Sequence, residues 1–219
     1  MFPYSSHLTP AGKVRRLLCL GGATTSFFLT LLASSFVVSA RAASTTSAST
    51  ATCPSAALSQ AFARWGDSSS YELVAGGSFE GSLSGWTLSG GAQKVAGSEP
   101  YGATGTVGSF SLGLPAGASA QSPFTCVEAG YKTFRFFARN TGTASKILVQ
   151  VVYQTPIGLV SVPVGTVTSS SGWQPTPAMP TGAGLAGLLM GGTAQMALRF
   201  TAVTGNSAID DVFVDPRMR

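Results

Sequence analysis

The alternation of apolar and polar positions is clearest in residues 131–139 (YKTFRFFAR). A period of two is the pattern of a β-strand, because successive side chains point to opposite faces of a sheet. The segment divides into two rows, with Phe134, Phe136 and Ala138 on one face and Arg135, Phe137 and Arg139 on the other. We therefore expect a strand that buries one aromatic row and presents the other outward.

Further short strands are predicted between Gly, Pro and Asn turn residues. Residues 147–153 and 159–164 flank a Pro-Ile-Gly turn and predict a hairpin, whereas Pro175, Pro177 and Pro180 disfavour a helix or a central strand. The other expected strands lie at 92–96, 109–114, 119–124, 196–203 and 208–216. Many short strands without helical periodicity predict an all-β fold, a two-sheet antiparallel β-sandwich of the jelly-roll type.

The stretch from Leu73 to Leu88 (LVAGGSFEGSLSGWTL) opens this domain. Its glycines allow positive φ and close backbone approach, and Phe79 and Trp86 provide large side chains to bury. We read it as the first strand, its turn and the start of the second strand.

The first 42 residues have the features of a secretory signal peptide. Lys13, Arg15 and Arg16 precede an acid-free apolar run over 17–38, and cleavage is expected at Ala40-Arg41-Ala42 or at Val38-Ser39-Ala40. The run is also long enough to span a bilayer, so an uncleaved membrane anchor is the alternative. With cleavage, the protein is secreted and has no membrane partner.

Residues 43–70 form a lead-in to the sandwich domain at 71–219. The Ser/Thr-rich tract 43–52 is too poor in apolar residues to fold alone. Leu58, Phe62 and Trp65 have helical spacing and predict one or two helical turns, with Trp65 as a lid over one end of the sandwich.

Charge and cysteine content fit an extracellular domain. Four of the thirteen Lys and Arg residues lie in the first 42 positions, which leaves nine against eight acids and gives no indication of a nucleic-acid partner. Cys53 and Cys126 remain after cleavage, and in an oxidising compartment such a pair is expected to form a disulfide. The alternative, a reactive thiol, lacks a nearby His or basic cluster.

Catalytic motifs are few. The one histidine, His7, precedes the apolar run, and no G-x-S-x-G motif occurs. Residues 182–187 match G-x-G-x-x-G but follow a proline-rich loop rather than a strand, which disfavours dinucleotide binding. The eight acids show no recognisable glycosidase pairing. We therefore expect that the protein is not an enzyme.

Residues at both ends of the domain resemble a known family. The Gly-Gly-Ser-Phe-Glu segment, the Gly-Trp pair after it and the closing Ile-Asp-Asp-Val are similar to the ends of galactose-binding-domain-like jelly rolls. These include carbohydrate-binding modules attached to secreted xylanases and glucanases. The similarity covers residues 71–216, while the interior, RFFARN to LRFTAV, is more similar to small secreted bacterial proteins of unknown role.

The resemblance implies a non-catalytic module for an extracellular or cell-wall carbohydrate. The alternatives are a structural or protein-interaction domain of the cell surface without a small ligand and, least favoured, a glycoside hydrolase. The oligomeric state is not indicated.

The resemblance also implies a structural calcium ion that joins the opening and closing strands. Its matching positions are Glu80, Asp210 and Asp211. Because strand residues alternate, one of the two aspartates must face the core, and a buried carboxylate needs a partner. The alternative partners are turn amides or an arginine.

Two places are expected for a carbohydrate. In the resembling modules, sugar lies across a sheet face or in the loops at one edge. The face candidates are Arg135, Phe137 and Arg139, joined by Arg199 if the two strands are neighbours, and the loop candidates are Tyr101 and Trp173. Aromatic rings stack on sugars and guanidinium groups donate directed hydrogen bonds. The alternative is that the N-terminal segment covers Phe137 and that nearby acids pair with the arginines.

Overall fold

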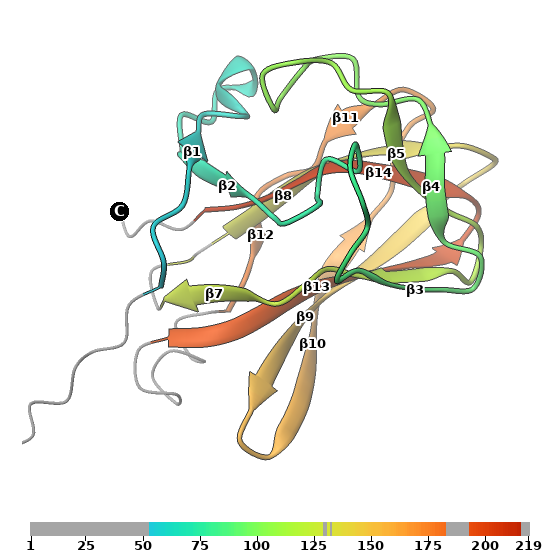
Figure 1. Ribbon diagram of the computed structural model, residues 1–219. Coiled ribbons are helices and arrows are strands. Elements are labelled where there is room, and N and C mark those ends of the chain that lie inside the picture. Colours follow the sequence, from blue (N-terminus) through green and yellow to red (C-terminus); the bar gives the residue numbers. More distant parts are fainter. Residues whose placement is uncertain (1–52, 129–130, 132, 183–192, 216–219) are drawn as a thin grey trace, which may run out of the picture. The chain divides into compact units, whose positions relative to one another are not determined.

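The computed structural model describes residues 53–128, 131, 133–182 and 193–215. In this part of the chain two antiparallel sheets pack against each other, and the chain crosses between them repeatedly (Figure 1). The predicted β-sandwich is thereby confirmed. The predicted signal peptide, the Ser/Thr-rich tract and the G-x-G-x-x-G segment after its first glycine lie outside the described residues.

The first sheet, here called sheet A, is centred on β14 (Ser207–Val214), whose eight residues are all buried. Strand β14 pairs on one side with β8 (Thr133–Asn140) and on the other with β2 and β5. Besides β14 and β8, sheet A contains six strands: β1 (Leu58–Ser59), β2 (Tyr71–Leu73), β4 (Gln93–Ala96), β5 (Phe110–Leu114), β11 (Gln174–Pro175) and β12 (Met179–Pro180).

The second sheet, sheet B, contains the longest strands of the described part. Strand β13 (Thr193–Thr204) lies between β9 (Lys146–Thr155) on one side and β6 (Ser119–Gln121) and β7 (Thr125–Glu128) on the other. The edges are β10 (Gly158–Val167) and β3 (Thr87–Ser89). Strands β9 and β10 form the predicted hairpin, which projects from the sheet (Figure 1). Ile157, in the turn between the two strands, is exposed.

Aromatic residues fill the space between the sheets. Phe136 of sheet A meets Phe200 of sheet B edge to face, with ring centroids 4.9 Å apart, and Trp86 stacks on Phe200 with ring centroids 6.4 Å apart. The Trp86 indole Nε1 donates a hydrogen bond to the Ala75 carbonyl (3.0 Å), so its polar group is satisfied on burial. Trp86 belongs to the opening stretch, whose predicted strand, turn and second strand are present as β2, a glycine turn and β3.

A backbone junction joins the opening turn to the closing strand. The Val74 amide donates to the Val212 carbonyl (2.9 Å), and the Val212 amide donates to the Gly77 carbonyl (3.0 Å). A Cβ at position 77 would lie 2.9 Å from the Val74 carbonyl oxygen, which is too close for any other residue. On β14 the junction coincides with a bulge, and Asp211 takes the left-handed φ of 45° there.

The N-terminal segment packs on the outer face of sheet A. Instead of the predicted helical turns it has the short strand β1 and a 3₁₀ turn, η1 (Ala63–Trp65). Leu58 and Ser59 pair with β2 and are therefore extended rather than helical. Phe62 has no exposed surface; it stacks on Phe137 with ring centroids 5.5 Å apart. Its edge contacts with Tyr71 and Phe213 complete a second apolar cluster.

An ion pair fixes the same segment in place. The Arg135 Nη1 donates to Asp67 Oδ2 (2.9 Å), and the Tyr71 hydroxyl donates to the same oxygen (2.6 Å). The Arg135 Nε donates to the Thr176 carbonyl (2.8 Å), and its guanidinium lies 4.3 Å from the centre of the Phe62 ring. The two charges are thus held by several bonds at the margin of the aromatic cluster.

The predicted disulfide between Cys53 and Cys126 is confirmed, with Cα atoms 5.5 Å apart. Cys126 lies in β7 of sheet B, whereas the segment that follows Cys53 packs on sheet A. The Cys53 amide also donates to Glu128 Oε1 (2.9 Å). The disulfide therefore links the two sheets through the N-terminal segment.

Within the described residues, no helix has the length and apolar character needed to cross a membrane.

Removing the disulfide should destabilise the domain. We expect Cys53→Ala/Cys126→Ala to lower the free energy of unfolding by about 4 kcal/mol, because the unfolded chain regains the entropy of a 73-residue separation. Urea denaturation of the oxidised protein and the variant measures the difference. Equal midpoints would contradict a stabilising role.

The Asp67–Arg135 pair should make stability depend on pH in the acid range. Burial alone raises the Asp67 pKa, but hydrogen bonds from Ser69, Tyr71 and Arg135 bring it well below its usual 3.8. A lowered folded-state pKa stabilises the protein above about pH 4, and this contribution disappears as the pH falls further. Asp67→Asn should therefore cost about 1–3 kcal/mol at pH 7, and the difference from the parent should shrink between pH 4 and pH 2.

Glu72 provides the control for this experiment. Burial raises its pKa, so Glu72→Gln should not show a deficit that vanishes on acidification. A constant difference between Asp67→Asn and the parent down to pH 2 would show that the charge of Asp67 is not what stabilises the segment.

Candidate functional site

The predicted sheet-face row does not form an open surface. Phe137 is completely buried beneath Phe62, Trp65 and Tyr101, so the expectation that it is available to a ligand is wrong. The N-terminal segment covers it, which is the alternative stated above. Arg135 is 8% exposed and engaged with Asp67. Of the three, only Arg139 keeps substantial exposure.

Arg199 does not join this row. Its strand, β13, belongs to sheet B, whereas β8 belongs to sheet A, so the condition under which Arg199 would join the row is not met. Arg199 Nε and Nη2 both donate to Gln121 Oε1, at 3.1 and 2.7 Å. Gln121, Arg199 and Gln150 are cross-strand partners and form a polar row on the outer face of sheet B.

Trp173 is also not accessible as predicted. It is 8% exposed, and the guanidinium of Arg139 lies 4.9 Å from the centre of its ring. Its carbonyl accepts a hydrogen bond from the Tyr101 hydroxyl (2.9 Å). Trp173 therefore supports the positions of Tyr101 and Arg139 and presents little surface itself.

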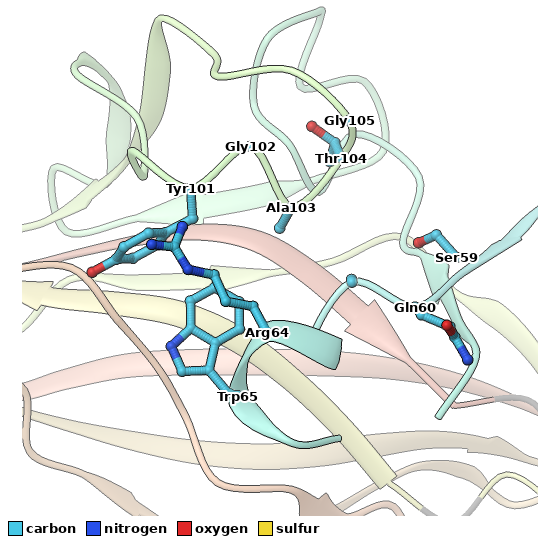
Figure 2. Close-up of a pocket in the computed structure, with 10 residues that line it drawn as sticks. Ser59, Gln60, Arg64, Trp65, Tyr101, Gly102, Ala103, Thr104 and Gly105 are labelled. Carbon is cyan, nitrogen blue, oxygen red and sulfur yellow. The ribbon is translucent and has the colours of Figure 1, made fainter. Parts of the chain in front are cut away.

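Tyr101, the other predicted loop residue, lines a cavity of about 310 Å³ between η1 and the loop 101–105. Its ring meets the Trp65 indole edge to face, with centroids 5.1 Å apart. The exposed Arg64 guanidinium lies 5.1 Å from the Tyr101 ring centre and 5.9 Å from that of Trp65 (Figure 2). Ser59, Gln60 and Thr104 add polar groups around the opening (Figure 2). We call this site the Trp65–Tyr101 pocket.

The loop that carries Tyr101 is organised by a buried carboxylate. Glu99 has no exposed surface; its Oε2 accepts from the Tyr101 amide (2.5 Å) and its Oε1 from the Ala103 amide (2.8 Å). Gly102 and Gly105 adopt positive φ of 67° and 102°, which closes the turn around it. The backbone of the pocket wall is thus determined by Glu99.

The sequence did not indicate Glu99, Arg64 or the pocket-facing position of Trp65. A glutamate within a Gly-rich loop of a chain with few charges was the available signal for Glu99. Trp65 was expected as a lid, and it does pack on Phe137, with ring centroids 5.3 Å apart, while its other surface lines the pocket.

Two of the three predicted calcium ligands, Glu80 and Asp210, accept hydrogen bonds. Glu80 Oε1 accepts from the amides of Ser109 and Phe110 (2.9 and 2.8 Å). Asp210 Oδ2 accepts from the Ser98 hydroxyl and the Glu99 amide (2.7 and 2.8 Å). Among the described residues no group of three or more acidic, His or Cys side chains is arranged as a metal site. Calcium binding stays a prediction.

The acids around β14 are nevertheless electrostatically unfavourable for one another. Burial, opposed by hydrogen bonds, raises the pKa of Asp210 to about 7. Burial and the charges of Asp210 and Glu99 raise the pKa of Asp211 to about 8, and Glu80 adds to this rise. Such a cluster favours the binding of a proton or a cation.

Three further cavities in the described part of the chain contain no carboxylate pair. One near the disulfide is lined by Glu128 and Tyr131, one lies beside the β9–β10 turn, and one lies on sheet A beside Arg139. None of these cavities, nor the Trp65–Tyr101 pocket, is lined by two acids as glycoside hydrolysis requires.

Comparison with known proteins gave similarity at the level of structure. No protein-family model matches the sequence, and no curated protein matches it. The CBM22-1–GH10 modules of Clostridium thermocellum endo-1,4-β-D-xylanase 10B, in complex with xylohexaose, share 18% identity with this chain at a TM-score of 0.47. The match covers 64% of this chain and 27% of that one.

Two isolated carbohydrate-binding modules are also similar. The CBM22-1 xylan-binding domain from Paenibacillus barcinonensis is 13% identical at a TM-score of 0.46, covering 65% of this chain and 92% of its own. The family 11 module of Clostridium thermocellum, solved with a β-1,3-1,4-mixed-linked tetrasaccharide, is 14% identical at a TM-score of 0.40, covering 65% of this chain and 94% of its own.

Proposed function

We propose that this protein is an exported, non-catalytic carbohydrate-binding domain that holds its ligand in the Trp65–Tyr101 pocket. The observation that supports the proposal is the pairing of two partly exposed aromatic rings with an exposed arginine at the mouth of a cavity. Sugars have apolar C–H faces and many hydroxyls, and such a site offers both a stacking surface and a directed donor.

The dimensions and support of the pocket fit this role. Its volume of about 310 Å³ lies at the lower end of the range for small-ligand pockets, ~300–1,000 Å³. Arg64 has no acidic partner within salt-bridge distance among the described residues, so its donors are available to hydroxyl groups. Phe137 and Glu99 hold the two walls from beneath, which keeps the rings in place before a ligand arrives.

The absence of catalysis is part of the proposal. The chain has a single histidine, His7, in the segment that signal cleavage would remove, and the described cavities lack a pair of carboxylates. Recognition without turnover is the activity that the remaining groups support.

We also propose that the acid cluster at β14 binds a structural calcium ion. Glu80, Asp210 and Asp211 supply hard oxygen ligands, and Glu99 joins them as a fourth carboxylate. Burial and the charges of neighbouring acids raise the pKa of both aspartates, which supports a cation at this cluster. A bound cation would remove this repulsion and would stabilise the loop that forms the pocket wall.

Screening the purified protein against neutral polysaccharides and oligosaccharides tests the proposed function. We expect binding that Trp65→Ala abolishes and that Arg64→Ala weakens about tenfold or more, the loss given by one hydrogen bond to a charged group of ~1.5–3 kcal/mol. Titration calorimetry gives the affinities, and the melting temperature of Arg64→Ala should remain that of the parent because its side chain is exposed.

Arg199→Ala is the matched control, since it removes an arginine from the outer face of sheet B. Binding that disappears with Arg199→Ala but survives Arg64→Ala would place the ligand on sheet B. Failure of the parent protein to bind any member of the panel would reject the proposed function.

Adding calcium to chelator-treated protein tests the cation. We expect the melting temperature to rise, because a ligand at about 100 times its Kd stabilises the folded state by ~2.7 kcal/mol. The increase should be greater at pH 8 than at pH 5, since protons compete for the carboxylates. Asp211→Asn should abolish the shift and Glu72→Gln should retain it. An unchanged melting temperature of the parent would count against the ion.

A further inference from the structure

The cavity beside Arg139, mentioned above, has a volume of about 310 Å³ and lies on the outer face of sheet A, away from the Trp65–Tyr101 pocket. Four cross-strand partners form a row beneath it: Gln93 pairs with Gly113, Gly113 with Ala208, and Ala208 with Arg139. Cross-strand partners share a face, so the cavity is a trough between the side chains of Gln93 and Arg139, with Ala208 in its floor and Val95 packed over Gly113. We call it the Arg139 trough.

Within the described part of the chain, the Arg139 guanidinium on the wall of this trough has no hydrogen-bond acceptor. Its Nε is buried without a hydrogen-bond partner, and among the described residues no carboxylate lies within salt-bridge distance. Asp210, the nearest acid on this face by strand register, uses its carboxylate oxygens for Ser98, Glu99 and Asp211 instead. The Trp173 ring covers the guanidinium at 4.9 Å and limits its movement.

The other polar residues of the trough also provide donors. Asn206 accepts from the Ala116 amide through Oδ1 (3.0 Å), which leaves its amide nitrogen as a donor. Thr141 and Gln93 are exposed and add a hydroxyl and an amide, and no acid is among the residues that line the cavity. A cavity with one unpaired guanidinium and several neutral donors has the chemistry of an anion site.

We propose that the Arg139 trough binds a carboxylate. If the protein binds carbohydrate, as proposed above, this carboxylate belongs to a hexuronic acid unit in an acidic glycan. A planar carboxylate matches the guanidinium edge, which can donate two parallel hydrogen bonds. The exposed donors beside it suit the ring hydroxyls of the same sugar. The trough would therefore add charge selectivity to a domain whose other pocket recognises neutral groups.

The test uses ¹⁵N-labelled protein and follows the side-chain Nε–H resonance of Arg139 during titration with sodium glucuronate, glucose and sodium acetate. We expect glucuronate to shift the resonance saturably and glucose to leave it unchanged. Acetate should shift the resonance with an affinity at least tenfold lower than that of glucuronate, because acetate lacks the ring hydroxyls. An unchanged resonance with glucuronate would overturn the proposal, and an equal response to acetate would overturn its sugar part.

A second measurement separates this proposal from the proposed function. Calorimetry with an oligogalacturonate and with the neutral glycan selected from the panel compares Arg139→Gln with Arg199→Gln. Arg139→Gln should reduce oligogalacturonate affinity at least tenfold and leave the neutral glycan unaffected, while Arg199→Gln should change neither. If Arg139→Gln does not fold, Arg139→Lys, which keeps the charge but loses the two-bond fork, should show the same selective loss.

The outcomes are distinguishable. Neutral glycan binding without a glucuronate response leaves the proposed function standing and rejects the trough. A glucuronate response at Arg139 in a protein that binds no neutral glycan leaves the carboxylate site standing and rejects the Trp65–Tyr101 pocket as the principal site. An equal loss of both ligands in Arg139→Gln would show a general structural effect and overturn the proposal.

Discussion

The contact between Asp67 and Arg135 holds together the parts of the molecule that form the candidate site. It joins the N-terminal segment to β8, and through Tyr71 and Thr176 it also contacts β2 and the segment before β12. With this pair in place, Phe62 lies against Phe137 and Trp65 faces Tyr101. Without it, Arg135 would be a nearly buried charge without its ion-pair partner, and the aromatic cluster would lose one edge.

A different kind of constraint acts on the opposite wall. Glu99 orients two backbone amides of the loop, and its own amide donates to Asp210 on the central strand. The pocket is therefore built between a segment held by opposite charges and a loop held close to like charges. Hydrogen bonds lower the pKa of Asp67 in the first wall, whereas burial and neighbouring charges raise the pKa values of Asp210 and Asp211 beside the second, so the two walls should respond differently to pH.

The alternation of residues was sufficient to predict the sandwich and its longer strands, but not the short strands β1, β7 and β12, and the cysteine content was sufficient to predict the disulfide. The alternation was not sufficient to predict which residues form the candidate site. Arg139 and Arg199 lie in strands with the same period, and only the pairing of β8 with β14 and of β13 with β9 assigns them to different sheets. Phe137 alternates like an outward residue, but Phe62, 75 positions earlier, covers it, and a local pattern carries no information on such a distant partner.

The pairing of β2 with β14 has a consequence in time. Leu73 lies opposite Phe213, and Val74 bonds to Val212, so the start of the domain finds its neighbours only when the end of the chain has arrived. Until then β5 and β8 lack the strand between them, and sheet A has no centre. Assembly of such a topology is slow because long loops must close before the contacts form. A chain interrupted before Ser207 would thus have a nearly complete sheet B but no surface on which either proposed site could form.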